Sequence, residues 1–310
     1  MLPGAQPDNP ATAMNSRLLI LCPGQGGQHA AMYDLARSDP HGAALLSQLA
    51  PMLPGLSDPA AMFSNHNAQP AIVASSLAMW EALRRDCPQP ALVAGYSIGE
   101  LTAYSVAGAF TPERTLALAA QRAALMDACV AGDSPQAMLA ISGRRTAALR
   151  PQLAAHGFHI AIETGEDSCI AGGPAANAAS LAIPGARIAQ LPVAVASHTP
   201  YLRAAVEPFA SLLSQEAFGT LQAPVLGGID AAPVRDKATA IGHLSRQLAE
   251  AILWADCMDA CAERGITAAL ELGPGSALSK MLLARHPGIA CRSVADFRSL
   301  DGIRNWLAHF

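Results

Sequence analysis

Short apolar runs alternate with longer segments of helical periodicity along most of the chain. The runs Leu18 to Cys22 and Leu92 to Gly95 are typical of buried strands. Two later runs have the same character, namely Pro224 to Gly228 and Ala268 to Leu272. The helical segments between them include residues 70–85, 112–130 and 200–215. This alternation predicts an α/β fold, with a mostly parallel sheet covered by helices on both faces.

The segment of residues 136–194 has a different pattern. Its strand-like and helical pieces follow the order strand, helix, strand, strand, helix, strand. In chain order they are Ala137 to Ser142, Thr146 to His156, His159 to Glu163, Ser168 to Ala171, Ala175 to Ala182 and Arg187 to Leu191. That order is typical of a ferredoxin-like unit. We therefore expect residues 136–194 to form a small ferredoxin-like subdomain inserted in a larger domain.

Composition and charge exclude several classes of protein. Of the 310 residues, 51% are hydrophobic and 14% are charged, so the chain can bury a large core. The net charge of −4 argues against nucleic acid or an anionic membrane as the main partner. No apolar stretch is long enough to span a membrane, and Met1 to Ser16 reads as a disordered leader without signal-peptide features. Seven scattered cysteines without a CxxC pair indicate reduced thiols, no metal site and a cytoplasmic protein.

The pentapeptide Gly95-Tyr96-Ser97-Ile98-Gly99 lies between a predicted strand and the helical segment Glu100 to Ala107. Glycine two places before and after the serine allows the sharp turn of a nucleophile elbow. The hydroxyl then projects from the turn, and the helix N-terminus favours developing negative charge. This context predicts Ser97 as the nucleophile of an acyl-transfer reaction. The alternative is a tight turn whose serine has no role.

A glycine-rich loop, Pro23 to Gln28, follows the first predicted strand. Its glycines expose main-chain N–H groups, and a tetrahedral oxyanion needs two preorganised donors. We expect the main-chain amides of Gln25 and Ile98 to form this oxyanion hole. A phosphate-binding loop is the rival interpretation, but the lysine and the spacing of a Walker sequence are absent.

Several motifs together carry a resemblance to a known family. They are Cys-Pro-Gly-Gln-Gly-Gly-Gln at 22–28, Gln-Pro-Ala at 69–71, Gly-Tyr-Ser-Ile-Gly-Glu at 95–100, Gln-Arg-Ala-Ala-Leu-Met at 121–126, Ala-Ser-His-Thr-Pro at 196–200, Gln247 ahead of Trp254, and Glu-Leu-Gly-Pro-Gly-Ser-Ala-Leu at 271–278. In this order and spacing, the chain from about Leu18 to Leu283 resembles the malonyl-CoA:acyl carrier protein transacylase family.

The resemblance implies an α/β-hydrolase-like acyltransferase core formed by residues 17–135 and 195–310. It also implies transfer of a malonyl group from CoA to the thiol of a carrier protein's prosthetic group, through a malonyl-serine intermediate. Malonyl-CoA is then a substrate, and no cofactor is bound permanently. The implied partners are an acyl carrier protein and the CoA thioester.

The resemblance assigns His198 as the general base, oriented by the main-chain carbonyl of Gln247 instead of a carboxylate. His198 precedes a predicted helix in which Thr199 is the expected N-cap and Pro200 the first residue. The positive end of that helix disfavours imidazolium, so we expect a neutral His198 that can accept the Ser97 proton.

Arg122 lies in an otherwise apolar helical segment, where an unpaired guanidinium is costly. Its fork suits a carboxylate, and the resemblance assigns it to the free carboxylate of the malonyl group. A salt bridge to Glu163, Asp127 or another acid is the alternative.

Two other functions are open at this point. Ser97, Asp230 and either His286 or His243 follow the chain order of the Ser-Asp-His triad in α/β-hydrolases, which would suit an esterase or thioesterase. The other is a docking module that keeps the fold without catalysis.

Three positions depart from the usual family pattern. Tyr96 stands where the family usually has His, Gly228 where it often has Asn, and Ser197 where it usually has Phe. The change at Ser197 is associated with methylmalonyl transfer in related polyketide acyltransferases. The motifs around Tyr96 and Ser197 look most like the malonyltransferase subunit of bacterial malonate decarboxylase, which loads a dedicated carrier subunit. We expect that context, with a fatty-acid or polyketide malonyl or methylmalonyl transacylase as the alternative.

Overall fold

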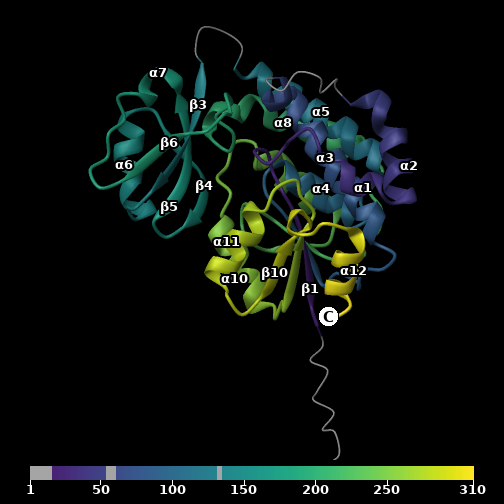
Figure 1. Cartoon of the computed structure of the whole chain (residues 1–310). Coiled ribbons are helices and arrows are strands. Elements are labelled where there is room, and N and C mark those ends of the chain that lie inside the picture. Colours follow the sequence, from purple (N-terminus) through teal and green to yellow (C-terminus); the bar gives the residue numbers. More distant parts are fainter. Residues whose placement is uncertain (1–15, 54–60, 131–134) are drawn as a thin grey trace, which may run out of the picture.

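The computed structural model describes residues 16–53, 61–130 and 135–310 (Figure 1). Its larger sheet has six strands in the order β10-β9-β1-β2-β7-β8. Their bounds are β1 Leu18–Cys22, β2 Leu92–Gly95, β7 Val225–Leu226, β8 Pro233–Val234, β9 Ala268–Glu271 and β10 Ala290–Ser293. All neighbours pair in parallel except β8, which is antiparallel to β7. The four predicted strands are present, although β7 is shorter than expected, and β8 and β10 were not predicted.

The larger sheet is buried on both faces because alternate side chains of its strands enter two different cores. Leu18 and Ile20 face one core, and Leu19 and Leu21 face the other. The first core includes side chains of α1 Asp34–Arg37, α2 Pro40–Leu49, α3 Asn65–Leu83, α4 Ile98–Val106, α5 Pro112–Ala128, α8 Arg203–Gln215, α9 Lys237–Arg246 and α12 Leu300–Leu307. The second includes those of α10 Trp254–Glu263 and α11 Ala277–Arg285.

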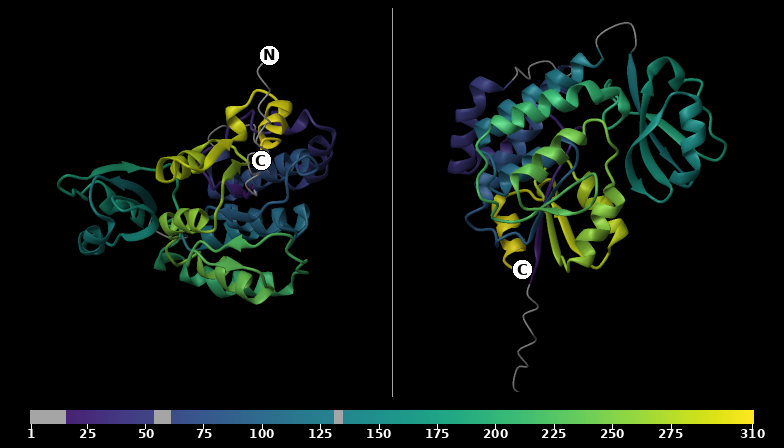
Figure 2. Two further views of the ribbon diagram at one scale, coloured as in Figure 1. Left: turned by 90° about the horizontal axis from the view of Figure 1, so that it is seen from below. Right: turned by 180° about the vertical axis from the view of Figure 1, so that it is seen from behind.

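The second sheet has four antiparallel strands in the order β4-β5-β3-β6. Its elements are β3 Gln136–Ser142, α6 Thr146–Ala155, β4 His159–Gly165, β5 Ser168–Pro174, α7 Ala175–Ala178 and β6 Arg187–Gln190. We call these elements the small unit, and the rest of the described chain the large unit. The small unit projects from one side of the large unit in both views of Figure 2. A main-chain bridge between Ile162 and Ile252 joins the two.

Two helical segments differ from the sequence prediction. Helix α3 begins at Asn65 rather than at residue 70, so Pro70 lies inside it. Residues 200–202 form a 3-10 turn before α8, in place of one continuous helix. The predicted leader lies mostly outside the described residues. Within the described ranges, no helix is both long and apolar enough to cross a membrane.

Candidate active site

The elbow that carries Ser97 is a tight connection between β2 and α4. Strand β2 ends at Gly95 and α4 begins at Ile98, and Ser97 between them has φ +57° and ψ −118°. A Cβ atom on Gly95 would overlap the main chain of Gly99, and one on Gly99 would overlap the carbonyl of Cys22. Only glycine fits at either position, so close packing of main chains holds Ser97 in its strained conformation.

His198 lies within hydrogen-bonding distance of Ser97. Its Nε2 atom is 2.7 Å from Ser97 Oγ, and its Nδ1 atom contacts the main-chain oxygen of Gln247. A carbonyl oxygen can only accept, so Nδ1 carries the hydrogen and Nε2 is left free to accept the Ser97 proton. The His198 side chain is buried, with 2% of the residue exposed.

The environment of His198 keeps its imidazole neutral. Burial, and then the charge of Arg122, lower the pKa of His198 to about 3, against the opposing effect of the Gln247 carbonyl. The predicted neutrality therefore has a different cause from the one expected. Thr199 does not cap a helix through its side chain, because its Oγ1 donates to Ala196 O at 2.6 Å. The segment after it is a single 3-10 turn rather than the start of a long helix.

Arg122 on α5 points at the same place and is 1% exposed. Its Nη1 donates to Gln69 Oε1 at 2.7 Å, and its Nη2 lies 3.4 Å from Ser97 Oγ and 3.5 Å from Gln247 Oε1. Burial lowers the pKa of Arg122 to about 10, which still leaves the guanidinium charged near neutral pH.

The acids considered as partners of Arg122 bind elsewhere. Glu163 pairs with Arg150, and Asp127 Oδ1 accepts from Asn65 Nδ2 at 2.8 Å. Within the described part of the chain, Arg122 forms no salt bridge. A buried cation without a carboxylate, beside a nucleophile, is suited to bind an anionic substrate group.

Glu100 is the buried acid whose charge most affects Arg122. Its Oε2 accepts from the Gly228 amide at 3.0 Å. Burial raises the pKa of Glu100 to about 8, even though the Gly228 amide and Arg122 act to lower it. Burial therefore favours the neutral form of this carboxyl, and Glu100 forms no salt bridge with Arg122. A Cβ atom on Gly228 would lie 2.9 Å from Glu100 Oε2, so the carboxyl leaves little room for a larger residue there.

The glycine-rich loop packs directly on the elbow. A Cβ atom on Gly24 would lie 2.8 Å from the Tyr96 carbonyl oxygen. The Gln25 side chain is held by Asn65, with Gln25 Nε2 donating to Asn65 Oδ1 at 2.9 Å. Neither the main-chain N–H of Gln25 nor that of Ile98 hydrogen-bonds to another of the described residues. Their role as an oxyanion hole stays a prediction.

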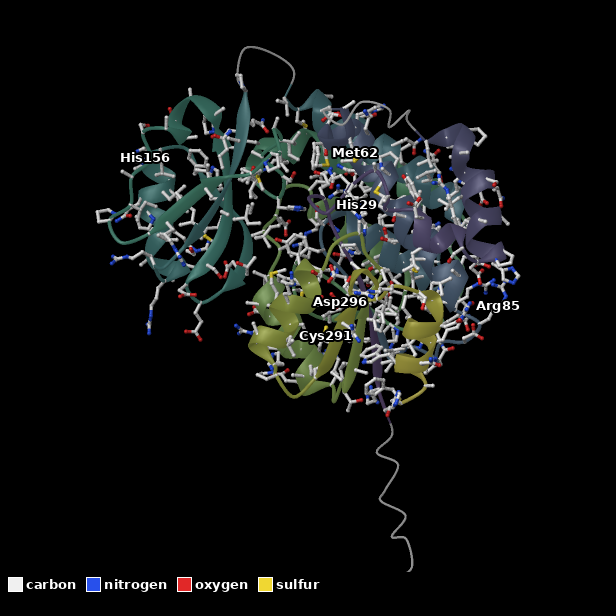
Figure 3. All side chains as sticks on the ribbon, viewed as in Figure 1. His29, Met62, Arg85, His156, Cys291 and Asp296 are labelled. Carbon is white, nitrogen blue, oxygen red and sulfur yellow. The ribbon has the colours of Figure 1, made fainter. Side chains whose placement is uncertain are left out.

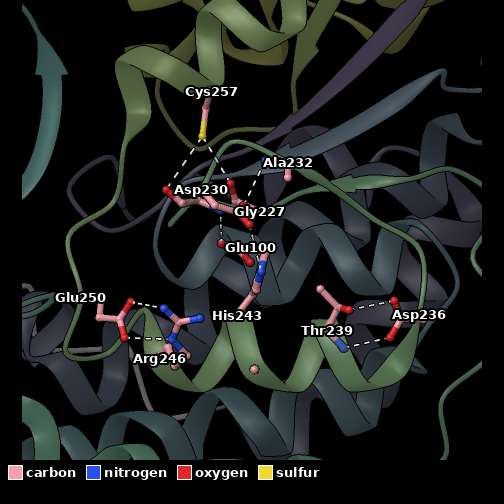
Figure 4. A network of polar contacts seen from close by, with 12 residues as sticks. Glu100, Gly227, Asp230, Ala232, Asp236, Thr239, His243, Arg246, Glu250 and Cys257 are labelled. Atoms are coloured by element: carbon pink, nitrogen blue, oxygen red, sulfur yellow. Dashed lines mark hydrogen bonds and ion pairs between the residues drawn. The ribbon is translucent and has the colours of Figure 1, made fainter.

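The histidines of the alternative triad have other partners. His243 Nε2 lies 3.3 Å from Asp230 Oδ2, in the polar network of Figure 4. His286 Nε2 lies 2.8 Å from Asp259 Oδ1. Neither is bonded to Ser97, so the Ser-Asp-His arrangement of a hydrolase is not formed.

Figure 3 places His156 at the outer end of the small unit. The described residues contain no group of three or more His, Cys, Asp or Glu side chains that could hold a metal ion.

Sequence reasoning missed three side chains of this site. Gln69 was noted only as part of a motif, Glu100 only as the end of another, and Asn65 was not considered. The spacing of Asn65 and Gln69, four residues apart and hence on one helix face, is the signal that could have linked them.

Two clefts border the glycine-rich loop. One, of about 770 Å³, lies between the loop with Tyr96, the small-unit strands β3, β5 and β6, and helix α11. The other, of about 570 Å³, is lined by Gln25, Asn65, Asp127 and residues 190–195 among others. Gln25 therefore lies where both clefts meet.

Comparisons with known proteins show which family the chain belongs to. Residues 20–286 match the acyl transferase domain family. The malonyl CoA-acyl carrier protein transacylase of Mycobacterium tuberculosis is 31% identical over 244 residues, which cover 77% of this chain and 80% of that protein. A solved structure of the transacylase of Mycobacterium tuberculosis is 28% identical and covers 94% of this chain and 99% of that one, with a TM-score of 0.83. The enzyme of Xanthomonas oryzae pv. oryzae is 26% identical, covering 95% and 98%, with a TM-score of 0.86. This chain belongs to the malonyl CoA-acyl carrier protein transacylase family.

Proposed function

We propose that this enzyme transfers a malonyl group from CoA to the thiol of an acyl carrier protein's prosthetic group, through a malonyl ester of Ser97. One observation carries the proposal. The Ser97 hydroxyl contacts the neutral, buried His198 and the buried Arg122, which has no acid partner among the described residues. Membership of the transacylase family supports the same reaction.

His198 Nε2 takes the proton of Ser97 as its oxygen attacks the thioester carbon. The Gln25 and Ile98 amides stabilise the oxyanion. The carbon–sulfur bond then breaks, and the proton passes from His198 to the departing CoA thiolate. The carrier thiol attacks the malonyl ester by the reverse sequence and gives ping-pong kinetics. Gln247 O holds the imidazole in the tautomer that this cycle needs.

Arg122 binds the distal carboxylate of the acyl group. Its guanidinium is fixed by Gln69 and lies within 3.4 Å of the nucleophile oxygen, so a short dicarboxylic acyl chain can bridge the two. Malonyl and methylmalonyl both carry this carboxylate, so direct competition between the two CoA thioesters measures the preference.

The carrier docks at the mouth between the two units, and its prosthetic arm enters the cleft of about 770 Å³. The relatives described above are acyl carrier protein transacylases, and they support an acyl carrier protein as acceptor better than the carrier subunit of malonate decarboxylase. The malonate decarboxylase context stays a prediction. Loading assays with both kinds of carrier separate the two.

We also propose that the large unit is an α/β-hydrolase-like core and the small unit, residues 136–194, a ferredoxin-like insertion. The sheet orders and the helices on both faces of the large sheet support this division. A cytoplasmic location is part of the proposal, supported by seven cysteines that are all free.

Intact-protein mass spectrometry after mixing with malonyl-CoA tests the function. We expect one malonyl adduct on Ser97, absent in Ser97→Ala, that discharges to a carrier thiol faster than to water. Faster discharge to water would make the protein a thioesterase, and an unlabelled Ser97 would leave a module without catalysis.

A further inference from the structure

The side chain of Asn65 joins three separate elements beside the active site. Its Oδ1 accepts from Gln25 Nε2 at 2.9 Å and from Gln69 Nε2 at 2.6 Å. Its Nδ2 donates to Asp127 Oδ1 at 2.8 Å and to Ala123 O at 3.2 Å. Because an amide offers two donors and two acceptor positions, the hydrogen-bonding capacity of Asn65 is fully used. The Asp127 carboxylate and the Ala123 carbonyl also fix which end of the amide is nitrogen.

These contacts connect the two ends of the proposed substrate site. Gln25 belongs to the loop after β1, which carries one predicted oxyanion donor. Gln69 Oε1 accepts from Arg122 Nη1 at 2.7 Å. A continuous chain of hydrogen bonds therefore runs from Gln25 through Asn65 and Gln69 to Arg122. Gln69 is 1% exposed, so water does not compete with its bonds.

Helix formation alone does not account for these contacts. The N-cap residue of α3 is Ser64, and Asn65 is the first residue of the helix proper. Asn67, not Asn65, ties the start of α3 to the turn before it, because Asn67 Nδ2 donates to Ala61 O at 3.0 Å. All four partners of Asn65 lie beyond this turn, on the β1 loop, further along α3 and on α5.

We propose that Asn65 is a positioning residue that sets the separation between the oxyanion loop and the carboxylate-binding Arg122. The inference rests on the proposed function, because it assumes that malonyl is held at both ends. A malonyl group must satisfy the loop amide with its thioester oxygen and Arg122 with its carboxylate at once. An acetyl group uses only the first of these contacts. Asn65 thus contributes to the choice of a dicarboxylic acyl chain without touching it.

The test compares Asn65→Ala with Asn67→Ala, a substitution of the same residue type on the same helix. Single-turnover loading of Ser97 is measured with malonyl-CoA and with acetyl-CoA. For Asn65→Ala we expect malonyl loading to fall about 10- to 100-fold and acetyl loading by less than about 5-fold. For Asn67→Ala the ratio of the two rates is unchanged. An equal loss of both activities in Asn65→Ala, or an unchanged ratio, overturns the inference.

A second pair of variants guards against a general folding defect. Asn65→Asp keeps both acceptor contacts but faces Asp127 with a like charge, and we expect it to lower the malonyl-to-acetyl ratio. Adding Asp127→Asn restores a donor opposite the new acceptor and should recover part of that ratio. Absence of recovery in a double variant that melts like the unsubstituted protein counts against the inference. If the unsubstituted protein itself forms no malonyl-Ser97, the proposed function fails instead.

Discussion

Two clusters in this molecule each contain one arginine and one histidine, and they differ in burial and in whether an acid accompanies them. At the surface, Asp259 accepts two hydrogen bonds from Arg285, both of 2.6 Å, and contacts His286. In the interior, Arg122 and His198 lie beside Ser97 without any such acid among the described residues. The surface cluster neutralises its own charge. The buried cluster leaves one positive charge for a ligand to neutralise.

One pKa is lowered in each cluster, but the two shifts favour opposite charge states, an ionised Asp259 and a neutral His198. Hydrogen bonding from Arg285 is the main cause that holds the pKa of Asp259 below its usual value. In the interior, burial and the charge of Arg122 hold the pKa of His198 near 3. A carboxylate beside His198 would raise that pKa and favour imidazolium, which cannot accept a proton. The absence of an acid therefore fits both roles that we propose here, carboxylate binding by Arg122 and proton acceptance by His198.

The largest contrast is expected between the two histidines. His198→Ala removes the proposed base that contacts Ser97, and we expect Ser97 loading to fall about 1,000-fold or more. His286→Ala breaks only a surface pair and should leave the rate within about 2-fold. Rapid-quench mass spectrometry of the malonyl adduct measures both. Comparable losses in the two variants would mean that the interior pair is not the catalytic one.

The two arginines should differ in how their replacement affects malonyl and acetyl transfer. Arg122→Ala removes the charge that we propose binds the carboxylate, so we expect malonyl transfer to fall about 100-fold or more while acetyl transfer is spared or improved. Arg285→Ala is the matched surface control and should change neither rate. Competition between malonyl-CoA and acetyl-CoA reports the ratio directly. A loss of both transfers to the same extent would contradict a carboxylate-binding role for Arg122.

The pH dependence of Ser97 loading tests the low pKa of His198. His198 must be neutral to act as base, and with a pKa of about 3 it stays neutral at all higher pH. We expect kcat/KM for Ser97 loading to show no fall attributable to His198 between about pH 8 and pH 5. An acid limb near the ordinary histidine value of about 6.5 would contradict this. Arg122→Gln should raise the pKa of His198 and so move the acid limb of the profile to higher pH, because the charge of Arg122 is the second cause that lowers this pKa.

The smallest effect concerns stability. Asp259→Asn weakens the surface cluster, and we expect the free energy of unfolding to drop by about 0.5 kcal/mol, since the Asp259 side chain is 38% exposed. Because the folded pKa is lowered, this contribution is present above the unfolded value of about 3.9 and is lost as pH falls through the folded value. Urea unfolding at neutral and acidic pH measures the change. An equal difference at both pH values would exclude ionisation of Asp259 as its source.

Local sequence was sufficient for some parts of the fold and not for others. The strands β1 and β2 are buried on both faces, so their apolar runs are continuous and easily recognised. Strand β10 is only partly buried and contains Arg292, so no such run marks it. Strand β8 has two residues and no pattern of its own.

The site divides in the same way. The tight turn at Ser97 was predictable because Gly95 and Gly99 lie two residues before and after it in the chain. The contact between Gln69 and Arg122 depends on how α3 packs against α5, over a separation of 53 residues, which periodicity does not encode. The predicted cause of a neutral His198, the end of a helix, was wrong for the same reason. Burial and the charge of Arg122, which is distant in sequence, lower the pKa of His198 instead.

Within the elbow, the two glycines do not tolerate a side chain, whereas the residue at position 96 already carries one. Gly95 and Gly99 are surrounded by main chain, which no compensating side-chain change can move away. Tyr96, between Gly95 and the nucleophile, faces the larger cleft and packs edge-on against Trp254. A substitution at Tyr96 therefore changes the lining of that cleft, whereas a substitution at either glycine displaces main chain beside Ser97. For protein engineering, Tyr96 is the elbow position to vary, and Gly95 and Gly99 are the positions to keep.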